Sequence, residues 1–174
     1  MDKIGIYGGS FNPIHTGHIL AISQLFLQGF DKIIVVPCYN HPFGKELISY
    51  EHRVNMCRLG LDHLKQDMIE VSTIESKLPA PSYTCNTIQA IIDQAQVKCK
   101  YNTIFGFDLE GDFNKWHGID IIRQLAPPYW MKRISGKSST LVRQMLKYSR
   151  GSSDFSEILP RKVQEYIHKN ELYK

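Results

Sequence analysis

Short runs of aliphatic and β-branched residues alternate along this chain with longer segments whose apolar residues recur at helical spacing, and this alternation constrains the fold most strongly. Residues 3–7 and 32–37 have the composition of buried strands, and residues 16–28 have the spacing of a helix that Gly29 can end in a left-handed conformation. A strand, a helix and a second strand in this order form a βαβ unit. We therefore predict an α/β fold, an open parallel sheet with helices on both faces.

The same alternation continues through the middle of the chain. Ser49 is a good N-cap for a second helix, residues 68–71 have the composition of a third strand, and residues 102–105 that of a fourth. Between these two strands, the apolar residues that follow Thr84 fall on one face of a helix. The sheet is therefore expected to have at least four strands.

The pattern is weaker in the last third of the chain. Residues 129–134 are compatible with a fifth strand or with an extended connection. A helix that begins at Ser138 or Ser139 would follow, and Pro160 favours the start of a last helix.

The composition fits one domain of ordinary size. No linker or repeat interrupts residues 1–174, and 43% apolar residues can bury one core, so we predict a single domain with a helical part from about residue 138. No segment approaches the roughly 18 consecutive apolar residues of a membrane span. The chain enters its first predicted strand without a signal peptide, so we expect a cytoplasmic protein with no membrane partner. The four cysteines form no Cys-x-x-Cys pair and are expected to be reduced and structural.

The formal net charge of +4 is unevenly distributed. From Lys132 onward the chain carries ten Lys or Arg residues against four Asp or Glu residues. A solvated basic face would explain this excess, and so would a site for an anion or a nucleotide phosphate. Because basic and aromatic residues do not interleave, no nucleic-acid partner is expected.

One segment joins the first predicted strand to the first helix, and its sequence is Gly8-Gly9-Ser10-Phe11-Asn12-Pro13-Ile14-His15-Thr16-Gly17-His18. Ligands of open α/β sheets bind at this end of the strands. Paired glycines let a phosphate approach the backbone, and the N–H groups at a helix start attract anions. His15 and His18 are three residues apart and can project to the same side of that helix start.

A purely structural turn or a pair of zinc ligands would also account for parts of this segment. Zinc needs at least a third protein ligand, and none follows at a suggestive distance. The segment matches neither a Walker A loop nor the Gly-x-Gly-x-x-Gly pattern of dinucleotide-binding enzymes. The combination of turn, helix start and histidines favours a phosphate site.

At this point the sequence resembles a known family. His15-Thr16-Gly17-His18 matches the signature of nucleotidyltransferases built on a Rossmann-like sheet, and residues 8–15 resemble the nicotinate (or nicotinamide) mononucleotide adenylyltransferase branch. Further matches cover nearly the whole chain in the family's order, namely Ser82-Tyr83-Thr84, Gly106-Phe107-Asp108, Trp116, Ser138-Ser139-Thr140-Leu141-Val142-Arg143 and the segment from Leu159-Pro160 to Leu172-Tyr173. The resemblance implies a Rossmann-like α/β fold of the nucleotidyltransferase type and adenylyl transfer from ATP to the mononucleotide in NAD biosynthesis.

The resemblance also implies three groups of site residues. The catalytic group comprises His15, His18 and Arg143, which are expected to face one cavity. The ATP-binding group comprises Gly8, Gly9, Ser10, Phe11, Gly17, Gly106, Asp108, Ser138, Ser139 and Thr140. The mononucleotide-binding group comprises Lys45, Ser82, Tyr83, Thr84 and Trp116.

Several of these residues have a competing structural role. Ser138 and the 82–84 segment can simply cap helices, Asp108 can be a helix N-cap rather than an acceptor for ribose hydroxyls, and Trp116 can belong to the core rather than stack on the pyridine ring. Lys45, or Arg53 beyond it, can contact phosphate or only solvent. Four histidines are assigned no role, and these are His52, His63, His117 and His168.

The implied reaction needs no protein nucleophile, because the mononucleotide phosphate is already an anion. His15 and His18 would donate hydrogen bonds to phosphate oxygens, with the polyanion favouring their imidazolium forms, and Arg143 would balance charge on pyrophosphate. Mg²⁺ is the expected cofactor, held by the ATP phosphates and water rather than by a protein metal site.

Three alternatives stay open at this stage. Nicotinamide mononucleotide can replace nicotinate mononucleotide, a sister transferase such as phosphopantetheine adenylyltransferase has the same histidine signature, and a nucleotide-binding sensor can retain the pocket without turnover. The connection over residues 122–138 is short for the family and Lys137 replaces an apolar residue, which puts the fifth strand and part of the adenine pocket in doubt. The oligomeric state is also open.

Overall fold

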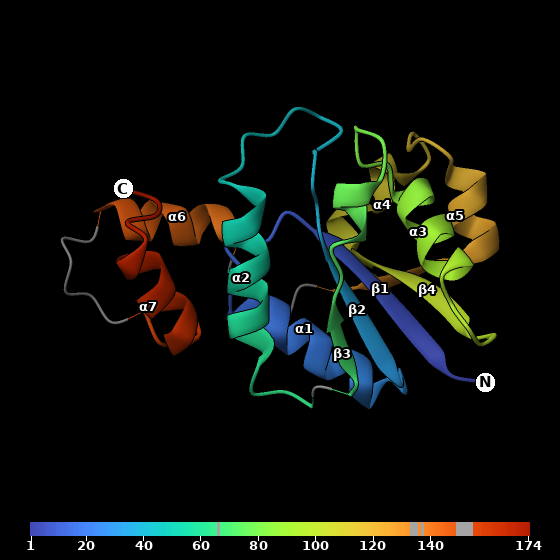
Figure 1. Ribbon diagram of the computed structural model, residues 1–174, viewed down its shortest axis with the longest axis horizontal. Helices are drawn as coiled ribbons and strands as arrows, with labels where there is room; N and C mark the ends of the chain where they lie inside the picture. Colours follow the sequence, from blue (N-terminus) through green and yellow to red (C-terminus); the bar gives the residue numbers. More distant parts are fainter. Residues whose placement is uncertain (66, 133–135, 137, 149–154) are drawn as a thin grey trace.

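The computed structural model describes residues 1–65, 67–132, 136, 138–148 and 155–174. Its centre is one parallel sheet with the strand order β3-β2-β1-β4-β5, as Figure 1 shows. The strands are β1 (Lys3–Gly9), β2 (Lys32–Pro37), β3 (Ile69–Val71), β4 (Lys100–Gly106) and β5 (Pro128–Met131). The chain runs outward from β1 to β3, returns to β4 beside β1, and continues to β5. The strand order therefore reverses between β1 and β4, which is where ligands of open α/β sheets bind.

Helices cover both faces of the sheet. The helices α1 (Thr16–Leu27) and α2 (Tyr50–Leu61) lie on one face, and α3 (Thr84–Asp93) and α5 (Ile119–Leu125) on the other (Figure 1). The helices α6 (Ser139–Tyr148) and α7 (Arg161–Lys169) lie beyond α2 and contribute to the same core as α1 and α2. Shorter elements are η1 (Ile74–Lys77), η2 (Phe107–Leu109) and α4 (Glu110–Phe113). The predicted α/β class and the coverage of both faces are confirmed.

After Lys32, strand β2 is an unbroken run of apolar residues. Ile33 and Val35 point into the core under α1 and α2, whereas Ile34 and Val36 point into the core under α3 and α5. A strand that is buried on both faces needs apolar residues at every position. Strand β1 pairs in parallel with this buried strand. It leads into residues 8–18, which we call the glycine-histidine segment.

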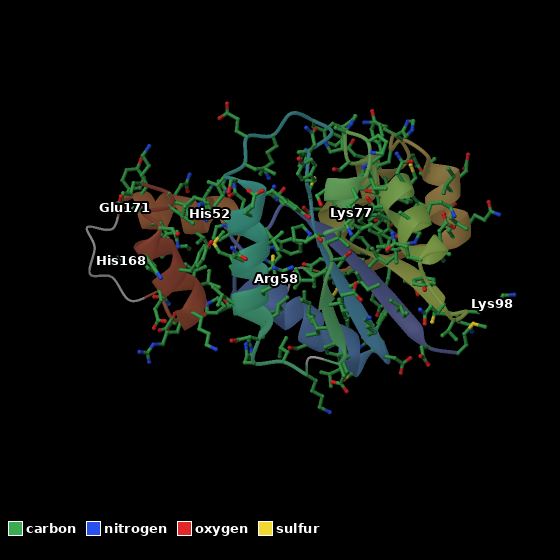
Figure 2. All side chains as sticks on the ribbon, in the orientation of Figure 1. His52, Arg58, Lys77, Lys98, His168 and Glu171 are labelled. Atoms are coloured by element: carbon green, nitrogen blue, oxygen red, sulfur yellow. The ribbon has the colours of Figure 1, made fainter. Side chains whose placement is uncertain are left out.

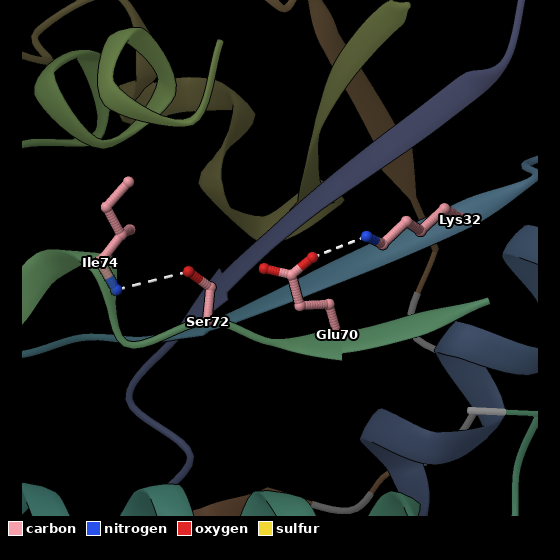
Figure 3. A network of polar contacts seen from close by, with 4 residues as sticks. All are labelled: Lys32, Glu70, Ser72 and Ile74. Atoms are coloured by element: carbon pink, nitrogen blue, oxygen red, sulfur yellow. Dashed lines mark hydrogen bonds and ion pairs between the residues drawn. The ribbon is translucent and has the colours of Figure 1, made fainter. Parts of the chain in front are cut away.

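Two polar contacts lie at the β3 edge of the sheet (Figure 3). Lys32 Nζ on β2 forms an ion pair of 2.6 Å with Glu70 Oε2 on β3. Two residues later, Ser72 Oγ accepts a hydrogen bond of 3.3 Å from the backbone N–H of Ile74. This second contact lies where the chain enters η1, which carries Glu75 toward the carboxyl end of the sheet.

Most predicted helix boundaries agree with the structure. Gly29 follows α1 with a φ of 79°, and Ser49 Oγ accepts a hydrogen bond of 3.4 Å from the N–H of His52 at the start of α2. The fifth strand is present as β5, so the short connection does not remove it. The continuation to Ile134 and the position of Lys137 lie outside the described residues.

Helix α5 was not predicted, and its start explains why. The preceding residue is Gly118, at a φ of 66°, where an added Cβ would lie 2.5 Å from Cys85 Sγ on α3. Close packing of the two helices, rather than a capping side chain, sets this boundary. Elsewhere in the described ranges, all four cysteines are free thiols and no helix combines the length and apolar character needed to cross a bilayer.

Candidate active site

A cavity of about 710 Å³ lies at the carboxyl ends of β1 and β4. Residues from segments that are far apart in the sequence line this cavity. The predicted site residues that line it are Gly8, Gly9, Ser10, Phe11, His15, Gly17, His18, Lys45, Ser82, Tyr83, Thr84, Gly106, Asp108, Trp116, Ser138, Ser139 and Thr140. Of the predicted set, Arg143 is not on the cavity wall. The structure therefore brings the proposed ATP and mononucleotide groups together around one space.

His15 and His18 form a reciprocal cap at the start of α1. His15 is the N-cap residue, and its Nδ1 accepts a hydrogen bond of 3.1 Å from the N–H of Gly17. The Nδ1 of His18 in turn accepts a hydrogen bond of 3.2 Å from the N–H of His15. The two rings lie with centroids 3.8 Å apart and planes 33° apart. The prediction that both histidines project to the same side is confirmed.

These hydrogen bonds set the tautomer of each ring in its neutral form. A nitrogen that accepts a backbone N–H cannot itself carry a proton, so each neutral imidazole carries its proton on Nε2. The imidazolium forms expected with a bound polyanion stay a prediction. Neutral rings of this tautomer still donate a hydrogen bond from Nε2.

The two glycines of the segment play different roles. An added Cβ on Gly8 would meet nothing within 4 Å, so this position opens onto the cavity, whereas an added Cβ on Gly9 would lie 3.1 Å from the ring of Phe11. Phe11 is 1% exposed, has a φ of 43°, and packs its ring 5.0 Å from that of His18. Gly9 therefore makes room for the ring that supports His18, and Gly8 leaves room for a ligand.

Side chains from later elements hold the carbonyl groups of this segment. Arg53 Nη1 donates to the carbonyl of Ser10 at 2.9 Å, and Ser139 Oγ donates to the carbonyl of Pro13 at 2.9 Å. Arg53 is 1% exposed, and it also binds the carbonyl of Ile48 through Nε at 3.1 Å. Arg53 therefore fixes the loop, and it is not placed to contact a phosphate in the cavity.

Arg143 is not among the residues that line the cavity, so its expected place beside the histidines stays a prediction. Its Nη1 donates to the carbonyl of Asn12 at 2.8 Å, and its Nη2 donates to Thr140 Oγ1 at 3.2 Å. Thr140 lines the cavity, so the guanidinium lies within hydrogen-bond distance of a residue of the cavity wall. The helical spacing of three residues brings Thr140 and Arg143 together, and the carbonyl of Asn12 holds the same guanidinium.

Asp108 lies within η2 and is exposed at the cavity. An added Cβ on Gly106 would lie 2.5 Å from Asp108 Oδ1, so the carboxylate folds back over this glycine. The N-cap positions of η2 and α4 are Gly106 and Leu109, which removes the alternative of Asp108 as a helix cap. Asp108 is therefore a carboxylate of the cavity wall that lies within η2.

Aromatic rings from the segments around α3 and Trp116 form part of the cavity wall. Trp116 is half-buried, and its ring packs edge-on at 5.0 Å against Phe105 of the core while also lining the cavity. Tyr83, the N-cap residue of α3, stacks on His117 at 4.2 Å with planes 29° apart. The core and binding roles of Trp116 are thus compatible. His117, to which the sequence assigned no role, belongs to this wall.

Glu75 is the main feature of the site that sequence reasoning missed. It is 7% exposed, lines the cavity, and accepts hydrogen bonds of 2.9 Å from the N–H of Tyr39 and 2.9 Å from Thr87 Oγ1. Burial raises the pKa of its carboxyl group above the ordinary value, although these donors oppose the shift. It joins the segment after β2 to α3. No local pattern marks it, because its importance arises from contacts with distant segments.

Two further lining residues have shifted pKa values. Burial, together with the charge of nearby Glu75, raises the pKa of the Cys38 thiol to about 12, so this thiol stays protonated and is a poor nucleophile. Burial and the nearby charges of Lys45 and Arg53 lower the pKa of His41. Lys45 itself is an exposed cation at the cavity.

The other histidines lie away from the cavity. Figure 2 shows His52 and His168 on the α2 and α7 side of the molecule. His52 Nδ1 lies 2.9 Å from the hydroxyl of Tyr166, which joins α2 to α7. Neither these residues nor His63 line the cavity.

The described residues do not support a protein-held metal site. Within residues 1–65, 67–132, 138–148 and 155–174, no three His, Cys, Asp or Glu residues are grouped to hold a metal ion. His15 and His18 also use their Nδ1 atoms for the backbone. A zinc pair is therefore not supported. Hydroxyls and imidazoles at the cavity suit the oxygens of phosphates.

Known proteins similar to this chain agree with the geometry. The cytidylyltransferase-like family model matches residues 6–145. The "probable nicotinate-nucleotide adenylyltransferase" of Streptococcus mutans is 32% identical, over 98% of this chain and 88% of the relative, and that of Bacillus pumilus is 28% identical over 99% of each.

Solved structures show the same fold. The nicotinic acid mononucleotide adenylyltransferase of Plasmodium falciparum complexed with NaAD has a TM-score of 0.79 at 21% identity, over 99% of this chain and 98% of that one. The same protein complexed with APC has a TM-score of 0.74 at 21% identity, with the same coverage. The chain belongs to the cytidylyltransferase-like family and, within it, to the nicotinate-nucleotide adenylyltransferases.

Proposed function

We propose that this protein transfers the adenylyl group of ATP to nicotinate mononucleotide, forming nicotinate adenine dinucleotide and pyrophosphate in NAD biosynthesis. The observation that carries the proposal is the pair of imidazoles at the start of α1, whose Nδ1 atoms accept backbone N–H groups, on the wall of a cavity at the β1–β4 switch point. A volume of about 710 Å³ lies within the range of small-molecule sites. The names of the relatives and the NaAD-bound structural neighbour support the same substrates.

The reaction proceeds by attack of a 5′-phosphate oxygen of the mononucleotide on the α-phosphorus of ATP. A new P–O bond forms, the bond from the α-phosphorus to the oxygen that bridges to the β-phosphate breaks, and pyrophosphate leaves with the electron pair. The attacking group is already an anion, so the protein has to position and stabilise rather than to activate it. Protonated Cys38 fits this requirement, because no thiolate is needed.

The glycine-histidine segment binds the phosphates in this proposal. Gly8 leaves space for close approach, and the N–H groups at the start of α1 favour negative charge. The Nε2–H groups of His15 and His18 donate to phosphate oxygens and stabilise charge that develops in the transition state. Because their Nδ1 atoms are held by the backbone, these donors are oriented before ATP binds.

The start of α6 completes the phosphate side. Ser138, Ser139 and Thr140 line the cavity, with the Ser139 hydroxyl proton donated to the Pro13 carbonyl, and Arg143 places its positive charge beside Thr140. In this position Arg143 orients Thr140 and balances charge on the departing pyrophosphate at short range. It does so without a direct contact with the phosphates.

The opposite wall binds the mononucleotide. Trp116 offers its ring to the pyridine base, and Lys45 and the start of α3 at Thr84 supply positive charge for a carboxylate. Glu75, a strongly buried carboxylate of the same wall, is engaged by donors from Tyr39 and Thr87. The positive charge of Lys45 and of the helix start favours nicotinate over nicotinamide.

Mg²⁺ fits this site as an ion that arrives on the nucleotide. The described residues offer no cluster of carboxylates that could hold it, so the ATP phosphates and water would supply its ligands. The ion would neutralise charge on the phosphates. We also propose a cytoplasmic location, because the four free thiols suit a reducing compartment.

The experiment is a pyrophosphate-release assay with ATP and each of three acceptors, namely nicotinate mononucleotide, nicotinamide mononucleotide and phosphopantetheine. We expect release with nicotinate mononucleotide and a kcat/KM at least tenfold above that for nicotinamide mononucleotide. Preference for phosphopantetheine would show a sister transferase. Nucleotide binding without any release would show a non-catalytic sensor.

A further inference from the structure

Asn12 is a shared acceptor for two segments that lie late in the chain. Its backbone carbonyl accepts the hydrogen bond of 2.8 Å from Arg143 Nη1, and its side-chain Oδ1 accepts a hydrogen bond of 2.8 Å from the hydroxyl of Tyr173. Asn12 is 3% exposed. Two donors, one from α6 and one from the segment after α7, therefore fix both oxygens of one buried residue in the glycine-histidine segment.

Tyr173 reaches Asn12 through an unusual backbone conformation. Glu171 has a φ of 54° and Tyr173 a φ of 63°, and bulky residues rarely adopt this left-handed region. Between them, Leu172 packs against the core, and its N–H donates to the carbonyl of Ile167 at 3.1 Å. Strained residues of this kind persist where surrounding contacts determine them, and they concentrate at functional sites.

The hydroxyl of Tyr173 is suited to act as a permanent hydrogen-bond donor. Burial raises the pKa of Tyr173, so its hydroxyl keeps its proton throughout the physiological range, although the charges of Arg143 and Arg53 oppose the shift. With Oδ1 engaged by this donor, the Asn12 side chain cannot turn toward Arg143. Among the described residues, the guanidinium donates to the Asn12 carbonyl and to Thr140, and Thr140 lines the cavity.

From this geometry we propose that Tyr173 is a positioning residue of the active site, which holds Asn12 so that Arg143 and Thr140 stay aligned at the phosphate end of the cavity. The inference rests on the proposed function, because it assigns Tyr173 a part in the same reaction. Tyr173 acts through Asn12 and Arg143 and does not itself touch the substrate.

The test compares Tyr173→Phe with Tyr166→Phe. Each variant removes one hydroxyl from the same region, but the hydroxyl of Tyr166 contacts His52 and Asn55 on α2 rather than the loop. For Tyr173→Phe we expect kcat to fall about three- to tenfold, the effect of one lost hydrogen bond, with KM for both substrates unchanged. For Tyr166→Phe we expect a similar loss of thermal stability and an unchanged kcat. Equal kcat values for the two variants would overturn the proposal.

A double-mutant cycle with Arg143→Ala identifies the route of the effect. If Tyr173 acts through Arg143, Tyr173→Phe lowers kcat no further in the Arg143→Ala background. The same fold-decrease in both backgrounds would overturn the proposal. Failure of the proposed function looks different, because wild-type protein would then release no pyrophosphate. A drop in kcat for Arg143→Ala without one for Tyr173→Phe would reject the role of Tyr173 alone.

Discussion

The Nδ1 atoms of His15 and His18 are both committed to backbone N–H groups, and the two rings lie 3.8 Å apart, centroid to centroid. The same pair of side chains therefore begins α1 and supplies the Nε2–H donors proposed for catalysis. A substitution that preserves the cap and removes the ring separates these two roles.

His15→Asn is that substitution. An Asn side chain also caps helices well, so its oxygen can accept the N–H of Gly17, but it has no imidazole N–H to donate. We expect kcat to fall about a hundredfold to a thousandfold. The thermal midpoint is expected to stay near that of the wild type, whereas His15→Ala should lower it by about 2 to 4 °C. Turnover at the wild-type rate in His15→Asn would reject the donor role.

His18→Ala removes the second donor. We expect turnover to fall by the same factor of about a hundred to a thousand, with the circular dichroism spectrum unchanged. Single-turnover measurements under saturating substrates would locate the defect in the chemical step. A change confined to KM would mean that His18 only binds substrate.

Gly8→Ala tests whether bound ATP occupies the open space beside Gly8 on β1. An added Cβ here meets no protein atom within 4 Å, so we expect an unchanged thermal midpoint and a KM for ATP raised about tenfold or more. The matched control is Gly5→Ala on the same strand, where the Cβ would lie 2.7 Å from Ile33 Cδ1. That variant is expected to lose stability by about 1 to 3 kcal/mol while KM is retained. An unchanged KM for Gly8→Ala would place the phosphates elsewhere.

Glu75→Gln should change how stability depends on pH. Burial raises the pKa of Glu75, so the folded state binds this proton more tightly than the unfolded state does. The free energy of unfolding of the wild type therefore falls as pH rises from the ordinary carboxyl range through the raised pKa. Gln cannot ionise and avoids this fall. Urea unfolding at pH 5 and pH 8 should show Glu75→Gln gaining stability over the wild type at the higher pH. The exposed Glu46→Gln serves as the control, and an equal gain there would refute the argument.

Trp116→Leu tests the base-binding wall. Trp116 lines the cavity, whereas Trp130 packs 5.5 Å from the same Phe105 ring without lining it. Both Leu variants are expected to lose stability, because both remove core contacts. Only Trp116→Leu should raise the KM for the mononucleotide, by about two- to tenfold, with KM for ATP unchanged. The same rise in Trp130→Leu would show that the effect comes from general loosening.

Local signals in the sequence predicted the parts of the site that depend on neighbouring residues. The turn at Gly8 and Gly9, the helix start at His15 and the spacing of Thr140 and Arg143 are all encoded within a few positions. The same holds for the strands, because a continuous apolar run is the direct requirement of burial on two faces.

The rest depends on which distant segments meet. Glu75 has no local pattern, and its role follows from Tyr39 and Thr87 on other elements. The direction of the Arg143 guanidinium follows from the Asn12 carbonyl, 131 positions earlier, and no spacing rule connects the two. Sequence periodicity places a side chain on a face, but it does not say which buried carbonyl that side chain will bind.

The segment after β1 is held by partners that follow it by long intervals. Its contacts with Ser139, Arg143, Glu157 and Tyr173 close chain separations of 126, 131, 141 and 161 residues. Contacts of such high sequence separation are slow to form, because the chain loses the entropy of closing a long loop before the contact stabilises it. A partly folded chain with β1, α1 and β2 already joined would therefore lack a finished nucleotide pocket. During refolding, ATP affinity should consequently recover later than the helical circular dichroism signal. The reason is that the nucleotide pocket is complete only in the native state.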